Sequence, residues 1–308
     1  MTWTLPATHL SVSILSTYPA GSTHSAIVKA LDASGNTATG YRGTVHFTST
    51  DPAAVLPADY TFGPGDAGVH TFSVTLKKAG TQAVRARDTV ASAITGVQNG
   101  ISVTPAAAAT LVVSGLSSPR TAGAAGTITV TARDAYGNTA TGYRGTVHFT
   151  STDTAALLPA NYTFTSGDAG VRTVSLTLKT AGAQAVRARD TVTSTITGVQ
   201  NGITVNPAAA ETLVVSGLSS PRAAGVAGTL TVTARDAYGN TATGYRGTVT
   251  FTSTDTAALL PSNYTFSAAS AGTHTFSVTL ETAGTQAIRA RDTVTTTITG
   301  LQRGIVVT

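Results

Sequence analysis

The sequence predicts an all-β protein built of three tandem antiparallel β-sandwich domains in an elongated array. Three observations lead to this prediction. The segment 134–153 recurs almost verbatim from Asp32 and from Asp236, so the chain repeats with a period of 102 residues. Short segments rich in β-branched residues alternate apolar and polar side chains, and none has helical periodicity. The 308 residues hold three such periods, each long enough to bury its own core.

The first half of a repeat is clearest in the second copy. A strand is expected at 111–114, and a second at 127–133, where small and branched apolar residues alternate with threonine. Segment 134–138, Asp-Ala-Tyr-Gly-Asn, predicts a turn, because Asp can bond the backbone two residues ahead and Gly-Asn accepts positive φ. Alternation resumes at 145–150. Segment 158–164 is expected to form a short edge strand, where Pro is tolerated.

The second half follows the same logic. After the loop 165–170, segment 171–179 places its apolar residues on one face. Gly182 then turns the chain into a strand at 184–189, whose arginines point outward, and a strand at 202–205 closes the unit. About seven short strands separated by turn residues favour a two-sheet antiparallel sandwich.

The repeats are joined by short linkers. The expected domains are 1–106, 107–208 and 209–308. The linkers 104–109 and 206–211 each begin with a Pro after one residue, which stiffens them, so they are not flexible tethers. Strand lengths suggest about 30 to 40 Å per domain and a rod of about 100 Å. Thr308 corresponds to Asn206, the residue before the Pro that opens the second linker.

Composition excludes several classes of function. Cysteine is absent, which removes disulfides, zinc–thiolate sites and cysteine nucleophiles. No apolar run is long enough to span a bilayer, and residues 1–6 lack the features of an export signal, which is therefore expected to lie outside this segment. The net charge is +5, but the cations are scattered and not interleaved with aromatic residues, so no nucleic-acid partner is expected.

The three copies can be compared with one another as a filter for catalysis, since a site required in every domain should survive in all three. His148 is replaced by Thr250 in the third copy, and glutamate occurs only at 211 and 281. No set of Ser, His and Asp recurs at positions where a triad could assemble. The chain is therefore expected not to be an enzyme and to require no cofactor.

Recurrent oxygen-bearing residues are a candidate for an interdomain calcium site. The turn after the second strand, the loop before the long strand and the end of the strand at 184–189 should lie at the end that meets the preceding domain. Carboxylates and loop carbonyls are hard ligands that suit Ca²⁺. The candidate residues are Asp32, Asn36, Asp66, Asp88, Asp134, Asn138, Asp168, Asp190, Asp236, Asn240 and Asp292. The alternative is that these residues cap turns and bond backbone N–H groups and neighbouring arginines.

A second candidate is a binding surface in the recurrent Thr-Gly-Tyr-Arg-Gly turn. It comprises Tyr41, Arg42, Tyr143, Arg144, Tyr245 and Arg246. Tyr and Arg are enriched at interfaces, so the pair could face a glycan or a protein. The alternative is that the ring packs over the edge of the sandwich with the arginine laid across it.

The copies resemble bacterial immunoglobulin-like domains of the kind found in intimin- and invasin-type adhesins and in large repetitive surface proteins. The resemblance rests on segments 130–138, 145–149, 161–164, 169–170 and 188–190, and it covers the whole chain in triplicate. It implies an extracellular or cell-surface location. Related arrays stiffen their junctions with calcium, which the resemblance implies as an option here.

These observations predict a non-catalytic structural or adhesive stalk, a rod that projects or links a functional region. Alternatives are a protein- or glycan-binding module, a filament subunit that assembles through exposed edge strands, and the accessory part of a secreted hydrolase. The expected partners are other domains of a longer chain, a host-surface protein or glycan, or a second copy of the chain.

Overall fold

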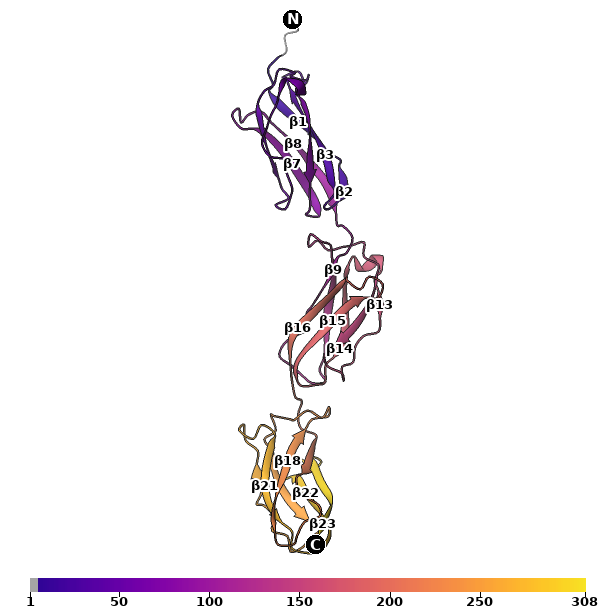
Figure 1. Cartoon of the computed structure of the whole chain (residues 1–308), viewed down its shortest axis with the longest axis vertical. Coiled ribbons are helices and arrows are strands. Elements are labelled where there is room, and N and C mark those ends of the chain that lie inside the picture. Colours follow the sequence, from indigo (N-terminus) through magenta and orange to yellow (C-terminus); the bar gives the residue numbers. More distant parts are fainter. Residues whose placement is uncertain (1–4) are drawn as a thin grey trace.

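The computed structural model describes residues 5–308 and contains three β-sandwiches arranged end to end (Figure 1). The first repeat contains β1 (His9–Ser13), β2 (Thr17–Pro19), β3 (Thr23–Leu31), β4 (Thr44–Ser49), β5 (Tyr60–Thr61), the 3-10 turn η1 (Pro64–Asp66), β6 (Val69–Thr75), β7 (Gly80–Asp88) and β8 (Thr95–Thr104). The second contains β9 (Thr110–Ser114), β10 (Arg120–Thr121), β11 (Ala125–Arg133), β12 (Thr146–Ser151), β13 (Tyr162–Thr163), η2 (Ser166–Asp168), β14 (Val171–Thr177), β15 (Gly182–Asp190) and β16 (Thr197–Asn206). The third contains β17 (Thr212–Ser216), β18 (Ala227–Arg235), β19 (Thr248–Ser253), β20 (Tyr264–Thr265), β21 (Thr273–Thr279), β22 (Gly284–Asp292) and β23 (Thr299–Val307).

Each repeat pairs a small sheet with a larger one. In the second repeat the small sheet has the order β14-β11-β9, and the larger sheet has the order β10-β16-β15-β12-β13. In this repeat all pairs are antiparallel except β10 with β16, and the first repeat has the equivalent parallel pair, β2 with β8. The third repeat has a single parallel bridge, between Arg222 and Val307, in place of the short strand β10. The predicted all-β class and two-sheet sandwich are therefore confirmed.

Three strands differ from the expectation. The edge strand expected at 158–164 is reduced to the two residues of β13 (Tyr162–Thr163). The last strand of the second repeat was expected at 202–205, but β16 begins at Thr197 and pairs with β15 on both sides of a bulge between Gln184 and Val186. Its first half contains Gly198, Gln200 and Asn201, which have low strand propensity, and tertiary pairing with β15 overrides that propensity. The parallel strand β10, two residues long, leaves no periodic signal in the sequence.

The expected alternation produces the core. In β12, Val147 and Phe149 are buried while His148 between them is exposed. Across the sheet, Phe149 lies opposite Ala188 of β15, which is also buried. Each repeat has its own cluster of buried apolar side chains, and no buried residue is shared between clusters. Burying one such side chain stabilises a domain by about 1.5–3 kcal/mol, so each repeat has the means to fold by itself.

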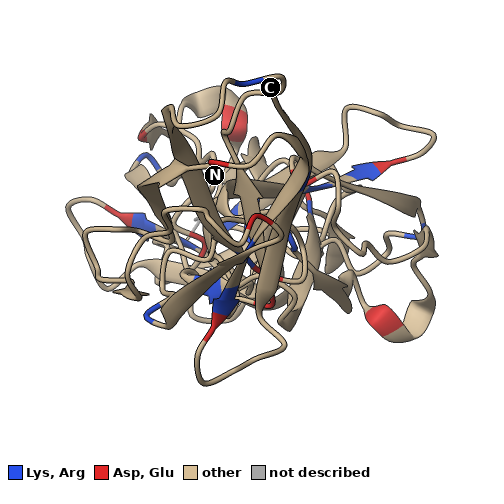
Figure 2. Cartoon of the chain, turned by 90° about the horizontal axis from the view of Figure 1, so that it is seen from below, with Lys and Arg blue, Asp and Glu red and all other residues tan. Residues whose placement is uncertain are grey.

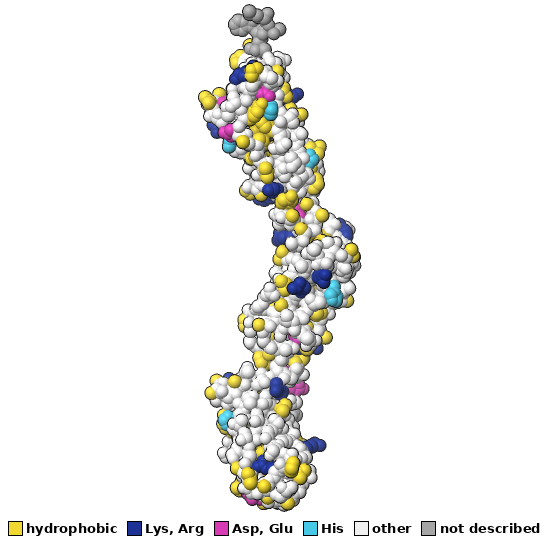
Figure 3. Space-filling view, in the orientation of Figure 1, with side chains coloured by type: hydrophobic (Ala, Val, Ile, Leu, Met, Phe, Trp, Pro, Cys, Tyr) yellow, Lys and Arg dark blue, Asp and Glu magenta, His cyan; other side chains and the backbone are white. Residues whose placement is uncertain are grey.

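The linkers are packed rather than free. Ala106 packs against the core of the first repeat, and Ala108 packs against the core of the second. The second linker does the same with Ala208 and Ala210. The molecule is narrower between domains than at them, and charged side chains are sparse over the face shown in Figure 3. Within residues 5–308 no helix is long and apolar enough to cross a membrane.

Candidate functional site at the domain junctions

The turn at 134–138 is held rigidly by its first residue. Asp134 is buried, and its Oδ1 atom accepts hydrogen bonds from the backbone N–H groups of Tyr136 and Asn138, both at 2.9 Å. Gly137 adopts φ +83°, which glycine tolerates without strain. The side chains of Tyr136 and Asn138 are thereby presented to the preceding domain. We call this segment the docking loop, together with its equivalents 32–36 and 236–240.

The asparagine of the docking loop bonds across the junction. Asn138 Nδ2 donates to the carbonyl of Lys77 at 2.7 Å, and Asn138 Oδ1 accepts the N–H of Ala79 at 2.8 Å. A side-chain amide has the donor and acceptor of a peptide group, so the two bonds act as one added rung of backbone pairing. Asn240 makes the same two bonds to Lys179 and Ala181, at 2.7 and 2.8 Å.

The same aspartate also holds the linker. Asp134 Oδ2 accepts hydrogen bonds from Asn138 Nδ2 at 2.8 Å and from the N–H of Ala106 at 3.0 Å. In the second junction, Asp236 Oδ2 accepts the N–H of Ala208 at 2.9 Å. Burial alone would raise the pKa of Asp134, but the hydrogen bonds from Asn138, Ala106 and Tyr136 outweigh it, and the pKa is lowered. The carboxylate therefore stays ionised and fixes loop and linker together.

The tyrosine of the docking loop packs on a glycine of the preceding domain. A Cβ atom on Gly21 would lie 1.9 Å from Tyr136 Oη, so no other residue fits there without displacing the ring. Gly123 faces Tyr238 in the same way, with a Cβ-to-Oη distance of 2.0 Å. Lys77 Nζ lies 6.0 Å from the centroid of the Tyr136 ring, at the outer limit of a cation–π contact.

The surface that receives the docking loop is itself braced. We call it the docking edge; in the first repeat it consists of Gly21, the Lys77 carbonyl and the Ala79 N–H. Asp51 is buried, and its Oδ2 accepts the N–H groups of Lys77 at 2.5 Å and Lys78 at 2.9 Å. The carbonyl of Lys77 consequently points outward to the next domain. Asp51 and its equivalent Asp153 thus orient the edge that the next domain contacts.

A second polar pair lies beside each linker and is internal to its own domain. The Tyr143 hydroxyl donates to Asp190 Oδ2, and Asp190 Oδ1 accepts the N–H groups of Val192 at 2.9 Å and Thr193 at 2.8 Å. Burial raises the pKa of Tyr143, as does its bond to Asp190. Burial would also raise the pKa of Asp190, but the bonds from Tyr143 and the two N–H groups lower it overall. A Cβ on Gly145 would lie 1.9 Å from Asp190 Oδ2, which explains the glycine of the Tyr-Arg-Gly sequence.

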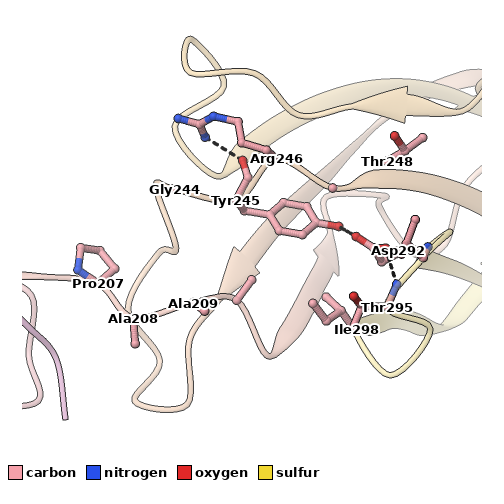
Figure 4. A pocket seen from close by; sticks show the side chains of 13 residues that line it. Pro207, Ala208, Ala209, Gly244, Tyr245, Arg246, Thr248, Asp292, Thr295 and Ile298 are labelled. Carbon is pink, nitrogen blue, oxygen red and sulfur yellow. Dashed lines mark hydrogen bonds between the residues drawn. The ribbon is translucent and has the colours of Figure 1, made fainter. Parts of the chain in front are cut away.

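In the third repeat, a cavity of about 560 Å³ lies between the equivalent pair, Tyr245 and Asp292, and the second linker (Figure 4). Tyr245 points to Asp292 across its wall, and Asp292 accepts the N–H of Thr295. The two polar side chains satisfy each other, so the cavity presents mainly linker alanines and the side chain of Arg246. Its smaller counterpart in the second repeat has a volume of about 340 Å³.

The candidate calcium ligands lie at the predicted end of the domain, but each has its own partners. Asp134 and Asn138 form the docking loop, and Asp190 bonds Tyr143. Asp168 accepts the Tyr162 hydroxyl and the N–H of its own loop. The equivalent residues are bonded in the same way in the other repeats: Asp32, Asn36, Asp66 and Asp88 in the first, and Asp236, Asn240 and Asp292 in the third. Within residues 5–308 no three His, Cys, Asp or Glu side chains are grouped to hold a metal. Calcium at the junction stays a hypothesis, beside the turn-cap interpretation.

The predicted Tyr-Arg surface divides into a buried and an exposed half. Tyr41, Tyr143 and Tyr245 are each only 8% exposed, and each hydroxyl is bonded to a buried aspartate. The arginines lie outside; Arg42 Nη1 donates to the carbonyls of Thr39 and Tyr41, and Arg144 and Arg246 bond their turns in the same way. The tyrosine ring is therefore part of the sandwich, as in the alternative stated above.

Sequence reasoning missed the exposed half of the docking loop. Tyr136 was treated as part of a turn, and Lys77 as a scattered cation. The available signal was a recurrence between copies: Lys77 and Lys179 each precede a loop with tyrosine at the third position, Tyr136 and Tyr238.

The fold and the junctions define this chain as a tandem array of immunoglobulin-like β-sandwich domains. No protein-family model matches the sequence, and no curated protein matches it. Among solved structures, the Escherichia coli adhesin FdeC is similar over 100% of this chain and 99% of its own, with a TM-score of 0.46 and 22% identity. InvD of Yersinia pseudotuberculosis is similar over 97% of both chains (TM-score 0.38, 18% identity). Invasin, a bacterial integrin-binding protein, is similar over 97% of this chain and 60% of its own (TM-score 0.36, 16% identity). These neighbours are bacterial adhesin- and invasin-type proteins with tandem immunoglobulin-like domains, the class that the sequence resemblance predicted. Identities of this size concern the fold and no ligand.

Proposed function

We propose that this chain is a non-catalytic extracellular stalk, a stiff rod that projects or links a functional region at a cell surface. The observation that supports this proposal most strongly is the junction. Two successive junctions use the same asparagine bonds, the same aspartate bond to the linker and the same tyrosine on glycine. A chain of independent domains would have no reason to repeat one contact geometry at every boundary.

The contacts restrict three kinds of motion. The two asparagine bonds oppose separation of the domains, and the packed linker alanines oppose sliding. Tyr136 against Gly21 opposes twisting, because rotation would drive the ring into backbone. Each neutral hydrogen bond contributes about 0.5–1.5 kcal/mol net, so the clamp at one junction is worth on the order of 1–3 kcal/mol. That suffices to populate one orientation predominantly.

The test measures order across a junction. The chain has no cysteine, so single cysteines can be placed for spin labels at Ser73 and Ser175, equivalent exposed strand positions in the first and second repeats. Pulsed electron paramagnetic resonance should give a narrow distance distribution. Asn138→Ala should broaden it and shorten the maximum dimension in small-angle scattering, because both cross-junction bonds are lost.

The chain offers a matched control. Asn36 occupies the same loop position in the first repeat, is exposed, and within residues 5–308 makes no hydrogen bond to another repeat. Asn36→Ala should leave the distance distribution and the scattering unchanged. A broad distribution in the wild-type chain would contradict the stalk proposal directly.

A second candidate function is supported by a surface hollow that occurs in every repeat. It lies on the larger sheet beside the bulge, with volumes of about 220, 240 and 370 Å³ in the three repeats. Each hollow is lined by a Thr-Ser-Thr segment and by an arginine at the same position, namely Arg85, Arg187 or Arg289; the third hollow is also lined by Arg303. Hydroxyls with a guanidinium suit a glycan that carries a carboxylate, and three copies would act multivalently.

A glycan array with the intact chain tests this alternative. Binding should be lost when Arg85, Arg187 and Arg289 are changed together to Ala, and should weaken steeply when only one arginine is changed, because avidity falls with valency. The control changes the exposed Arg42, Arg144 and Arg246 together to Ala, which removes the same charge and should leave glycan binding unchanged. Absence of hits on acidic glycans would remove this candidate.

A further inference from the structure

The surface hollow of the third repeat differs in charge from its two counterparts. It lies on the face of the larger sheet and is lined mainly by residues of β19, β22 and β23. Arg289 on β22 has a counterpart in every repeat, but Arg303 on β23 replaces an asparagine, which is Asn99 in the first repeat and Asn201 in the second. The third hollow therefore presents two guanidinium groups instead of one.

The strand register holds these two arginines close together. Arg289 pairs with Leu301, and Arg303 follows two residues later on β23 and lines the same hollow. Diagonal neighbours on paired strands have Cα atoms about 7–8 Å apart, which long side chains can span. Both arginines are exposed. The two guanidinium groups can therefore converge on one bound group.

The chain supplies no counter-charge for this pair. The lining of the hollow contains no carboxylate, and none of the ion pairs within residues 5–308 includes Arg289 or Arg303. The nearby Asp255 is buried, and its Oδ2 accepts the N–H groups of Glu281 at 2.7 Å and Thr282 at 3.0 Å. Like charges on neighbouring strands repel each other. An anion from outside the chain would offset this repulsion.

The lining leaves few other polar groups for a ligand. The Thr254 hydroxyl donates to Gln286 Oε1 and accepts the N–H of Ala287, both at 2.8 Å. Strand β22 is paired on both sides, with β19 and β23, so it offers no free backbone to an extended peptide. Thr252, opposite Arg289 on β19, is exposed. The hollow therefore suits a strongly anionic group on a molecule that carries hydroxyls.

The number of charges distinguishes between anions. A carboxylate carries one negative charge, whereas a phosphate monoester carries about 1.5 to 2 at pH 7 and has three strong acceptor oxygens. Each guanidinium can bond two of these oxygens at once. Two arginines therefore match a phosphate monoester better than they match a carboxylate.

We propose that the hollow of the third repeat binds the phosphate monoester of a saccharide. Arg289 and Arg303 bond the phosphate oxygens, and the Thr252 hydroxyl bonds a hydroxyl of the sugar. The proposal rests on the glycan-binding candidate function and is independent of the stalk. It identifies phosphate as the group recognised in the third repeat. The equivalent hollows contain residues of their own repeat alone, so each such site is complete within one domain.

The test titrates the intact chain with glucose 6-phosphate and follows its amide signals by NMR at constant ionic strength. At pH 7.5 the signals around Arg289 should shift and saturate, with an affinity about tenfold higher than that of the second hollow. At pH 5 the affinity should fall, because the phosphate takes up a proton with a pKa of about 6 while arginine keeps its charge. Glucose 6-sulfate has one charge at both pH values and should bind weakly and equally at both.

The repeats supply matched variants. Arg303→Asn recreates the first two hollows, so it should weaken binding about tenfold and remove most of the pH dependence. Asn201→Arg should give the second hollow the affinity of the third. Arg246→Asn removes an exposed arginine outside the hollow and should leave binding unchanged. All three positions are exposed, and unchanged melting temperatures will show that the variants fold.

The outcomes separate this inference from the candidate function on which it rests. Binding that survives Arg303→Asn but is lost in Arg289→Ala overturns the inference, as does an Asn201→Arg chain whose second hollow gains no affinity. Carboxylated glycans that bind where glucose 6-phosphate does not also overturn it and leave the glycan candidate standing. Failure of both kinds of probe overturns both. Tighter binding of O-phosphoserine than of glucose 6-phosphate overturns the assignment to a saccharide.

Discussion

At the residue scale, one buried position is filled in two different ways. In the first repeat, the Tyr18 ring packs on the His24 ring, with centroids 4.1 Å apart. In the second repeat, the same two positions hold Arg120 and Gly126, and the guanidinium lies over the glycine, where a Cβ would be 2.4 Å from Nη1. Burial lowers the pKa of Arg120, and its Nε atom has no hydrogen-bond partner. The tyrosine–histidine pair of the first repeat and the arginine–glycine pair of the second are thus two alternative ways to fill the same buried volume.

Because the two pairs fill the same volume, we expect a double-mutant cycle at positions 120 and 126 to show strong coupling. Gly126→His should destabilise the second repeat by about 1–3 kcal/mol, because the new side chain collides with the buried Arg120. Adding Arg120→Tyr should recover most of the loss, since it recreates the Tyr18–His24 pair. Denaturant unfolding of the two single variants and the double variant measures the coupling. Strictly additive effects would show that the two positions do not share one volume.

The loss of stability at low pH can also be assigned to single residues. Hydrogen bonds from the Thr282 N–H and then from its hydroxyl lower the pKa of Asp255 to about 2, against about 3.9 for an unperturbed aspartate. The folded state thus binds this proton more weakly than the unfolded state. The stabilisation is complete above about pH 4 and is lost as the pH falls towards the folded pKa of about 2.

We therefore expect the melting temperature to be constant between about pH 5 and 8 and to fall below about pH 4. Asp255→Asn should lower the plateau and flatten the acid limb, because the titrating group is gone. Glu211→Gln at an exposed position controls for net charge and should leave the curve unchanged. Differential scanning calorimetry across pH makes the measurement, and an identical acid limb in Asp255→Asn would refute the assignment.

At the element scale, the sequence predicted strands wherever one face is apolar. Residues 127–133 and 145–150 alternate clearly, and β11 and β12 form there. Strand β16 extends five residues before its expected start, because pairing with β15 compensates for its Gly and Asn residues. Local pattern cannot predict this, since the stabilising partner lies elsewhere in the chain.

Each Tyr–Asp pair ties two elements that local sequence does not connect. Tyr143 precedes β12, and Asp190 ends β15, 47 residues later. The tyrosine hydroxyl satisfies a buried carboxylate, and two N–H groups of the following turn satisfy its other oxygen. Loss of the hydroxyl would leave that carboxylate oxygen buried without a donor.

Tyr143→Phe should therefore destabilise the second repeat by about 1–3 kcal/mol, although the ring volume is kept. Because the three cores are separate, only one unfolding phase should move. Tyr136→Phe, at 43% exposure, is the matched control and should leave the repeat's unfolding free energy unchanged. Urea unfolding followed by repeat-specific amide signals reports both, and equal effects would contradict the role given to the buried pair.

At the scale of the whole molecule, the end-to-end arrangement of three domains could be predicted from the sequence, but the contacts at the domain junctions could not. The repeat period and the short Pro-containing linkers predicted three domains in a row. The junction contacts join Asn138 to Lys77, 61 residues away and in another domain, and nothing in a single repeat encodes that pairing. Viewed along the rod, loops with charged residues project in different directions around its axis (Figure 2). A surface that recurs in each repeat would therefore be distributed around the array instead of lying on one side.

The last prediction concerns calcium and the stiffness of the whole rod. Four N–H donors already occupy the two carboxylate oxygens of Asp134, and Asp168 and Asp190 are bonded to tyrosines of their own domain. A cation at this site would have to displace these donors. We expect that excess chelator changes neither the melting temperature nor the maximum dimension in scattering, and that added Ca²⁺ has no effect beyond that of Mg²⁺ at equal ionic strength. Shortening of the rod on chelation, reversed by Ca²⁺ and abolished by Asp134→Asn with Asp236→Asn, would instead establish the interdomain calcium site.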